Sequence, residues 1–467
     1  MLKSQGDEIK MKAIDFSCPM ESLHIHMVGI GGISMSALAH MLKFFGARVS
    51  GSDRCETETT KRLSAAGIEV KIGHSPDNIN EPSLVCYTAA IPKDNPELVK
   101  AKSLGIPMLE RAELLGQLMK LYKFPIAVAG THGKTTTTSM LSLVLLEASL
   151  DPTILVGGEL QQIGGNFKIG SKDYLVLEAC EYVESFLHFN PFISIITNVE
   201  EDHLDYFADI SHIISAFESF ARLNSPLGCI IVCSDDKNAQ TVVQNVKNKI
   251  VKYGIFGGNN DFYAENIRLD PCGKTCLSVY AYGKHAVDLE LSVHGNHNIQ
   301  NALAAFAAAW EIGISPEVIK RGLEKFGGTK RRFEELGSFD GITVVDDYAH
   351  HPTEIRSTLE TAKTLTKGNV WCIFQPHTYS RTKAFLNEFA NVLSIADRAI
   401  IADIFAAREV YDGTIHSCDL AEITNNALYI NDFSAIERYI RANAKPGDLV
   451  ITMGAGDIYK VGEKLVK

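Results

Sequence analysis

The sequence has no surplus of positive charge. It contains 45 Lys and Arg residues against 56 Asp and Glu residues, which gives a formal net charge of -11. A protein whose main partner is a nucleic-acid backbone needs an excess of cations to neutralise the phosphates. The composition therefore argues against a nucleic acid as the main partner.

Paired cysteines and long apolar runs are also missing. The ten cysteines occur without a CxxC pair, which argues against a disulfide framework and against a four-thiolate zinc site. No apolar stretch reaches the length of a membrane span, and the N-terminal residues are polar rather than signal-like. We therefore expect a protein of the reducing cytoplasm that does not bind membranes.

The length and the order of apolar segments indicate several domains. With 467 residues, 46% of them hydrophobic, the chain is too long for a single core. Short β-branched or apolar runs alternate with segments of helical period, which is typical of parallel sheets covered by helices. We predict an α/β protein with domains at 1–123, 124–329 and 330–467, the second carrying the hairpin-like segment LSVYAYGKHAVDLELSV.

A short phosphate-binding loop, AGTHGKTTT, follows the apolar run FPIAV and precedes a segment that is apolar at helical spacing. Gly133, Lys134 and Thr135 match the end of the usual pattern, but Val128 displaces its first glycine to Gly130. Such glycines let the backbone approach an anion, while the lysine reaches terminal phosphates and the threonine hydroxyl can bind Mg²⁺. The predicted nucleotide contacts of the loop are Gly130, Thr131, His132, Gly133, Lys134, Thr135 and Thr136.

Two further candidates follow predicted strands. Glu178 ends the strand in YLVLEACE, and His203 follows the strand in IITNVEEDHLDYF. At strand C-termini, a carboxylate and an imidazole could converge on Mg²⁺ beside the nucleotide. Taken alone, each also fits a structural role, as a strand-end acid or as the neighbour of a helix cap. Their combination with the phosphate loop favours the metal site.

A second glycine-rich turn lies near the N-terminus. In HMVGIGGISMSALA, Gly29, Gly31 and Gly32 follow a strand, and Asp53 comes about twenty residues later, as in a nucleotide-binding fold. Ser34 stands where the dinucleotide pattern has its third glycine, so a dehydrogenase is less attractive. The turn can still hold a diphosphate, with Asp53 accepting from a ribose hydroxyl. The alternative is a tight turn without a ligand.

Nine ordered stretches of the chain resemble the Mur ligase family. The resemblance extends from Ile25 to about Gly462, and it rests on GIGGISMSALA, YTAAIPKDNPE, AGTHGKTTT, LEACE, TNVEEDHLDYF, GNHNIQNALAA, RRFE, DDYAHHPTEI and FQPHTYSRT. It implies a Rossmann-like UDP-binding domain, a central P-loop ATPase domain with a mostly parallel sheet, and a Rossmann-like C-terminal domain.

The resemblance also implies a reaction of peptidoglycan precursor synthesis. L-alanine is joined to the lactyl carboxylate of UDP-N-acetylmuramate, with ATP becoming ADP and phosphate. Because a carboxylate is a poor electrophile, phosphoryl transfer first makes an acyl phosphate, which the amine attacks, and the protein positions the reactants and neutralises charge. ATP and two Mg²⁺ ions, for which Mn²⁺ can substitute, are the implied cofactors, and a monomer or weak homodimer is the implied assembly.

The family's site residues carry over to positions in the matching motifs. Lys134 and Thr135 would hold the ATP phosphates and one Mg²⁺ ion shared with Glu178, while His203 would serve the second ion. The implied further ATP contacts are Asn298, Asn301, Arg332 and Asp347. The implied substrate contacts are Gly29, Gly31, Gly32, Asp53 and Thr88 on one side, and His132, Tyr348, His350, His377 and Arg381 on the muramate and amino-acid side. Lys134, Glu178, His203 and His350 are the expected catalytic residues.

Three departures from the family pattern limit this transfer. Cys180 stands where some members have Asp, and it receives no role. Thr378 stands where many members have Arg, which leaves more of the binding to Arg381. Several Mur ligases carbamylate a lysine downstream of the metal-binding histidine, but no lysine lies between His203 and Lys237, so a carbamylated ligand in that segment is excluded.

Two other functions stay open from the sequence. One is a recycling ligase that attaches an intact peptide to the same UDP-sugar. It shares the ATP and UDP sites, so only the amino-acid pocket distinguishes it from an L-alanine ligase. The other is a non-catalytic, nucleotide-sensing regulator, against which the joint presence of Lys134, Glu178 and His203 argues.

Overall fold

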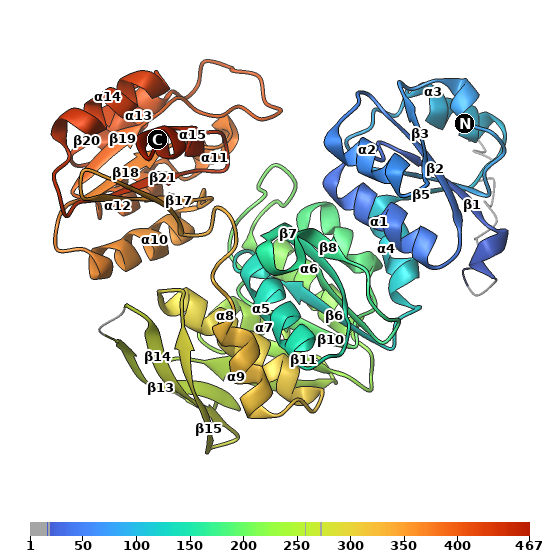
Figure 1. The fold of residues 1–467 in the computed structure, drawn as a ribbon, viewed down its shortest axis with the longest axis horizontal. Coiled ribbons are helices and arrows are strands. Elements are labelled where there is room, and N and C mark those ends of the chain that lie inside the picture. The colour runs from blue at the N-terminus through green and yellow to red at the C-terminus, as the bar shows by residue number, and fades with distance from the viewer. Residues whose placement is uncertain (1–15, 17–18, 257, 271–272) are drawn as a thin grey trace, which may run out of the picture.

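Three lobes, each built around one β-sheet, make up the computed structural model (Figure 1). The structure describes residue 16 and residues 19–256, 258–270 and 273–467, so residues 1–15, 17 and 18 of the predicted N-terminal domain lie outside the described residues. The sheets have five, ten and six strands, mostly parallel, and helices lie between the strands in sequence. The predicted α/β class is confirmed. No helix in the described part of the chain is long and apolar enough to cross a membrane.

The N-terminal sheet is wholly parallel, with the strand order β3-β2-β1-β4-β5. Its central strand begins the chain's first βα unit, so the following turn lies at the carboxyl edge of the sheet. The strands are β1 (His24–Val28), β2 (Arg48–Asp53), β3 (Glu69–Ile72), β4 (Leu84–Tyr87) and β5 (Met108–Glu110). The helices are α1 (Ile33–Phe44), α2 (Glu58–Ala65), α3 (Pro96–Ser103) and α4 (Arg111–Met119).

The central sheet has the order β15-β14-β13-β12-β11-β10-β6-β9-β7-β8. It is parallel in the middle and antiparallel at both ends, and β14 with β15 forms the predicted hairpin. The strands are β6 (Phe124–Ala129), β7 (Thr153–Leu160), β8 (Gly165–Lys168), β9 (Tyr174–Glu178), β10 (Ile193–Ile196), β11 (Cys229–Cys233), β12 (Lys249–Gly254), β13 (Phe262–Leu269), β14 (Thr275–Ala281) and β15 (Lys284–Leu291). The helices are α5 (Lys134–Glu147), η4 (Tyr182–His188), α6 (Ile210–Arg222), α7 (Lys237–Val242), α8 (Asn296–Glu311) and α9 (Pro316–Glu324).

The C-terminal sheet has the order β16-β17-β21-β18-β19-β20 and is parallel except for the β16–β17 pair. Its strands are β16 (Glu334–Phe339), β17 (Ile342–Asp347), β18 (Val370–Phe374), β19 (Arg398–Ile401), β20 (Ala427–Tyr429) and β21 (Leu449–Met453). The helices are α10 (Pro352–Leu365), α11 (Tyr379–Ala384), α12 (Leu386–Leu393), α13 (Ser417–Ile423), α14 (Phe433–Asn443) and α15 (Tyr459–Leu465).

Among the residues that the structure describes, apolar packing joins the first two domains but does not extend to the third. One cluster of buried side chains runs from Leu38 in α1 through Leu118 in α4 to Phe186 in η4. At Gly116 in α4, an added Cβ would overlap the carbonyl oxygen of His188, so the two domains touch at backbone distance. The C-terminal sheet packs its two faces into clusters of its own residues. The N-terminal and central domains therefore share a core, and the C-terminal domain has a separate one.

The chain enters the C-terminal domain through an anchored arginine. The guanidinium of Arg331 lies 4.9 Å from the ring centre of Tyr348 and 4.7 Å from that of Tyr459, and it pairs with Asp346 at 3.0 Å. Immediately upstream, a Cβ added at position 327 or 328, both glycines, would meet no atom within 4 Å. The linker is thus fixed at its C-terminal end and unpacked just before it.

Candidate active site

The phosphate loop connects β6 to α5, as the sequence predicts. Gly130 has φ +141°, and a Cβ there would overlap Thr197 Oγ1 at the end of β10. Gly133 has φ +81°, and a Cβ there would lie 2.5 Å from Asn301 Oδ1 of α8. Both positions need glycine because of conformation and close approach. The short loop is therefore pressed between a strand end and a helix of the same domain.

Lys134 begins α5 and turns its ammonium toward a carboxylate. Its Nζ donates to the carbonyl oxygens of Gly130 and Thr131, and to Glu181 Oε2 at 2.9 Å. Burial lowers the pKa of Lys134, but Glu181 outweighs that effect and holds the pKa above its usual value. The sequence assigned no role to Glu181, although it lies in the LEACE motif. The Lys134 ammonium, which is predicted to bind the ATP phosphates, is thus paired with the Glu181 carboxylate in this structure.

Glu178 and Thr135 face a pair of glycines in β7. A Cβ on Gly157 would lie 2.9 Å from both carboxylate oxygens of Glu178, and a Cβ on Gly158 would lie 3.2 Å from the methyl carbon of Thr135. Glu178 accepts a hydrogen bond from the Gly157 amide at 2.5 Å. The glycines therefore keep space open beside the two oxygen-bearing side chains.

His203 lies on the other side of Glu181. Its Nε2 is 3.9 Å from Glu181 Oε1, its ring packs on that of Tyr182 at 4.7 Å, and its backbone has φ +53°. A positive φ is uncommon in residues other than glycine, although histidine adopts it more readily than most. Glu181 thus links Lys134 to His203, a connection that the sequence spacing did not indicate.

A cavity of about 220 Å³ lies between the phosphate loop, α8 and the start of the C-terminal domain. Seven of the predicted site residues line it: His132, Gly133, Thr136, Asn298, Asn301, Arg332 and Asp347. They come from segments as far apart in sequence as 132 and 347, so the fold brings them together as the family resemblance implies. Asn198, Glu200, Asp235, Tyr253, Gln300 and Glu354 also line the cavity, and the sequence had assigned no role to any of them.

The polar side chains that line this cavity are held in place by hydrogen bonds to neighbouring residues. Asn301 Oδ1 accepts from Thr137 Oγ1 at 3.1 Å, and Asn298 donates to the carbonyl of His294 at 2.7 Å. Asp347 accepts from Thr358 Oγ1 at 3.0 Å, and burial raises the pKa of its carboxyl to about 6. Second contacts of this kind fix side-chain orientation before a ligand arrives.

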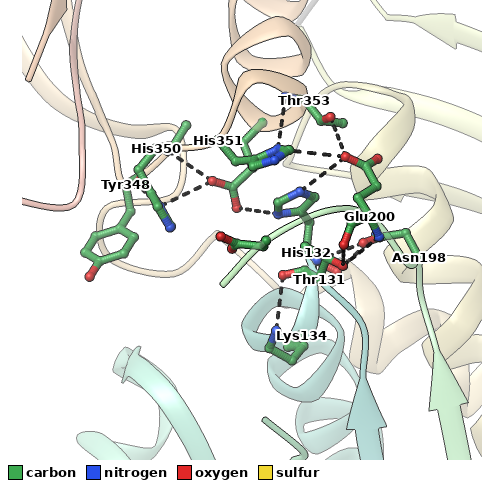
Figure 2. Close-up of polar contacts among 12 residues, drawn as sticks. Thr131, His132, Lys134, Asn198, Glu200, Tyr348, His350, His351 and Thr353 are labelled. Atoms are coloured by element: carbon green, nitrogen blue, oxygen red, sulfur yellow. Dashed lines mark hydrogen bonds and ion pairs between the residues drawn. The ribbon is translucent and has the colours of Figure 1, made fainter. Parts of the chain in front are cut away.

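His132 reaches from the loop to the C-terminal domain. Its Nδ1 lies 3.1 Å from Glu354 Oε1 of α10, and its Nε2 lies 3.6 Å from Glu200 Oε2 (Figure 2). Burial lowers the pKa of His132, but the two carboxylates raise it to about 9 overall. A charged imidazole thus bridges an acidic side chain from each domain.

A second interdomain contact borders a cavity of about 600 Å³, which is lined by His203, His377, Thr378 and Arg381 among others. Arg381 binds Asp202 at 2.5 Å and lies 3.1 Å from Nδ1 of His377. Burial raises the pKa of Asp202, but Arg381 outweighs it and holds the pKa well below its usual range. Thr378 caps α11 by accepting from the Arg381 amide.

His350 and Tyr348 lie between these two contacts. The ring centres of His350 and Tyr348 are 5.5 Å apart, and those of His350 and His377 are 5.8 Å apart. Nδ1 of His350 lies 3.1 Å from the Tyr348 carbonyl, and burial lowers the pKa of His350 to about 4. The imidazole is therefore neutral at pH 7.

The N-terminal glycine turn lies in its own domain. Asp53 accepts from the Gly31 amide at 2.8 Å, and a Cβ on Gly29 would lie 3.5 Å from the methyl carbon of Thr88. Gly32 is the N-cap of α1. The structure thus gathers these five predicted residues, Gly29, Gly31, Gly32, Asp53 and Thr88, around the first turn of α1.

Comparison with known proteins gives the family. Three family models match in order: "Mur ligase family, catalytic domain" over residues 24–123, "Mur ligase middle domain" over 128–309 and "Mur ligase, glutamate ligase domain" over 331–456. A UDP-N-acetylmuramate–L-alanine ligase of Acetivibrio thermocellus is 50% identical over 461 residues, covering 98% of each chain. The chain belongs to the Mur ligase family. As a Mur ligase, it is an ATP-dependent acid–amino-acid ligase, and the predicted resemblance is confirmed.

Two solved Mur ligase structures are similar over nearly the whole chain. A UDP-N-acetylmuramate–alanine ligase of Thermotoga maritima is 32% identical, with a TM-score of 0.76, covering 95% of this chain and 98% of that one. A murein peptide ligase of Psychrobacter arcticus is 27% identical, with a TM-score of 0.66 and the same coverage. The three-domain Mur ligase architecture of this chain agrees with both.

Proposed function

We propose that the chain joins L-alanine to the lactyl carboxylate of UDP-N-acetylmuramate, with ATP becoming ADP and phosphate. The observation that carries the proposal is the 220 Å³ cavity, where the phosphate loop and residues of the C-terminal domain meet. The relative of 50% identity, whose name states that reaction, supports the choice of substrates. We assign UDP-sugar binding to 1–123, ATP binding to 124–329 and completion of the site to 330–467.

ATP would bind with its phosphates on the loop at Gly130–Thr136. In this assignment the ammonium of Lys134 exchanges the Glu181 carboxylate for the terminal phosphates, while backbone N–H groups at the start of α5 contact phosphate oxygens. Asn298, Asn301, Arg332 and Asp347 would contact the rest of the nucleotide in the cavity. Because Arg332 and Asp347 come from the C-terminal domain, nucleotide binding would favour closure of the two domains.

The residues beside the loop suit Mg²⁺, a hard cation that prefers oxygen ligands. Thr135 and Glu178 would hold one ion in the space that Gly157 and Gly158 keep open, and His203 would serve a second. Glu181 lies close enough to both Lys134 and His203 to share in this site. Mg²⁺, when bound, would neutralise charge on the transferring phosphoryl group. Replacement by Mn²⁺ and the oligomeric state, monomer or weak homodimer, stay predictions.

The chemistry is a phosphoryl transfer followed by an acyl transfer. The lactyl carboxylate attacks the γ-phosphorus and ADP leaves, which gives an acyl phosphate. The alanine amine then attacks the acyl carbon, and phosphate leaves as the amide forms. Water must be excluded meanwhile, because the acyl phosphate hydrolyses.

We assign the muramate and alanine side to His132, Tyr348, His350, His377 and Arg381. Since Nδ1 of His350 faces the Tyr348 carbonyl, it carries the hydrogen, and Nε2 keeps a free lone pair. Because His350 is uncharged at pH 7, this lone pair would accept a hydrogen bond from the amine of L-alanine. Arg381 would bind the amino-acid carboxylate, because Thr378 offers no cation.

The recycling ligase is the second candidate, and it is not favoured. The murein peptide ligase is less similar in both identity and TM-score than the alanine ligase. Phosphate release with ATP, Mg²⁺ and UDP-N-acetylmuramate distinguishes them when either L-alanine or the L-alanyl tripeptide is added. We expect release with L-alanine; release with the peptide alone would contradict the proposal. Absence of any ligated product with all substrates present would support the regulator instead.

A further inference from the structure

His132, Glu200 and His351 bring three ligand atoms together at the boundary of two domains. These atoms lie within 4.8 Å of one another. Oε2 of Glu200 is 3.6 Å from Nε2 of His132 and 3.8 Å from Nδ1 of His351. Figure 2 shows both rings turned toward the Glu200 carboxylate. His132 and Glu200 belong to loops of the central domain, while His351 precedes α10 of the C-terminal domain.

The nitrogen that each histidine turns to Glu200 is the one that does not face the oxygen acceptor behind its ring, and in His351 this Nδ1 also accepts from the Thr353 amide at 3.4 Å. Nε2 of His351 lies 3.0 Å from the Glu201 carbonyl, so that nitrogen carries the hydrogen and Nδ1 carries the lone pair. Nδ1 of His132 lies 3.1 Å from Glu354, and its buried Nε2 has no hydrogen-bond partner. A cation that binds at this Nε2 displaces the proton that the charged imidazole carries there. An oxygen acceptor behind each imidazole is the arrangement found around metal-binding histidines.

The carboxylate is also held in place. Glu200 Oε2 accepts from Thr353 Oγ1 at 2.5 Å, and the Glu200 amide donates to Thr131 Oγ1 at 2.9 Å. In a tetrahedral zinc site with bonds of about 2.0–2.1 Å, ligand atoms lie about 3.3 Å apart. The three atoms therefore need to move inward by roughly 1.5 Å at most, counted from the 4.8 Å limit.

We propose that His132, Glu200 and His351 form a binding site for a borderline-soft divalent cation, Zn²⁺ fitting best, which clasps the central and C-terminal domains. Two imidazole nitrogens and one carboxylate oxygen suit Zn²⁺ better than Mg²⁺, which prefers oxygen ligands alone. The site is separate from the Glu178 and His203 side of the loop. Because its ligands come from both domains, the bound cation holds the central and C-terminal domains together.

Spectroscopic metal titration tests this proposal without measuring activity. The whole chain, stripped by a chelator, is titrated with Co²⁺, whose tetrahedral complexes absorb in the visible, and then with Zn²⁺. We expect one equivalent of Co²⁺ to give a tetrahedral spectrum that Zn²⁺ abolishes. Glu200→Gln and His351→Ala should each weaken binding by at least about tenfold. Glu200→Gln keeps the size of the side chain, so it tests the site even if His351→Ala disturbs the interface.

Two further variants serve as controls. His285→Ala, in the exposed β14–β15 hairpin, should leave Co²⁺ binding unchanged. His203→Ala should also retain the spectrum, since that residue lies outside the proposed ligand set. No tetrahedral spectrum in the wild type, a spectrum unaffected by both Glu200→Gln and His351→Ala, or a spectrum lost in His203→Ala would each overturn the proposal.

Discussion

The central domain meets its two neighbours through very different surfaces. Toward the N-terminal domain it shares an apolar core, in which α4 and η4 approach so closely that Gly116 has no room for a Cβ. Toward the C-terminal domain the described contacts at the site are polar, among them His132–Glu354, Thr353–Glu200 and Arg381–Asp202.

The difference indicates which boundary is able to open. Separating an apolar core exposes its area to water at about 25 cal/mol per Å². Separated ionic groups are rehydrated, which repays most of the lost attraction. The first two domains therefore form one body, and the third is held by contacts that water can replace. Substrates would enter and products leave along the polar boundary.

The largest expected effect comes from the loop on the central side of that boundary. Lys134→Ala should lower the rate of ligation by at least about a thousandfold, because no other described lysine or arginine pairs with Glu181 to take its place beside the phosphates. Phosphate release measures the rate. Affinity for UDP-N-acetylmuramate, measured calorimetrically, should stay within about twofold if that ligand is bound by the N-terminal domain; a comparable loss of affinity would refute this assignment.

Raised pH should weaken the polar boundary but not the apolar one. The pKa of His132 is raised from 6.5 to about 9, so its stabilisation is fully present below pH 6.5 and is lost as the pH rises through about 9. This rise in the pKa of His132 contributes at most about 3 kcal/mol to the free energy of unfolding. Urea unfolding gives the free energy of unfolding of the wild type and of His132→Gln. The difference between the two values should become smaller as the pH rises from 6.5 to 9. A difference in unfolding free energy that stays constant from pH 6.5 to 9 would contradict the charged state of His132.

Adding a methyl group at the apolar boundary tests its close packing. Gly116→Ala should lower the free energy of unfolding by about 2 kcal/mol, since its Cβ overlaps the His188 carbonyl. Gly165→Ala is a matched control, because a Cβ there meets no atom within 4 Å and its φ is not positive. The control should stay within about 0.5 kcal/mol of wild type. Equal effects of the two substitutions would argue against the shared core.

The smallest effect is expected from one ion pair of the polar boundary. Asp202→Asn removes the anion that Arg381 binds, so the closed arrangement should be less populated. We expect about a tenfold fall in kcat/KM, or roughly 1.4 kcal/mol. Small-angle scattering should give a larger radius of gyration for the variant. An unchanged kcat/KM together with an unchanged radius of gyration would contradict this role for the ion pair.

The sequence predicted the parts of the site that are local. The strand, loop and helix around Lys134 follow from neighbouring residues, and so does the β14–β15 hairpin. The pairing of His132 with Glu354 joins residues 222 apart, and no spacing rule predicts it. Glu181, Glu200 and Glu354 all lie inside the quoted motifs, which was the available signal. Each was missed because an acidic residue after a strand, or in the first turn of a helix, gains its role only from the residues that the fold places opposite it.

The anchored arginine of the linker determines where the third domain can turn. Arg331 is held between Tyr348 and Tyr459 and paired with Asp346, so it moves as part of the C-terminal domain. The C-terminal domain cannot turn about Arg331 without separating its guanidinium from the two tyrosine rings. The bend therefore belongs to the unpacked glycines at 327 and 328, four to five residues before Arg332. A swing about that point carries Arg332 and Asp347 together, so a nucleotide bound as proposed would gain or lose both contacts in a single motion.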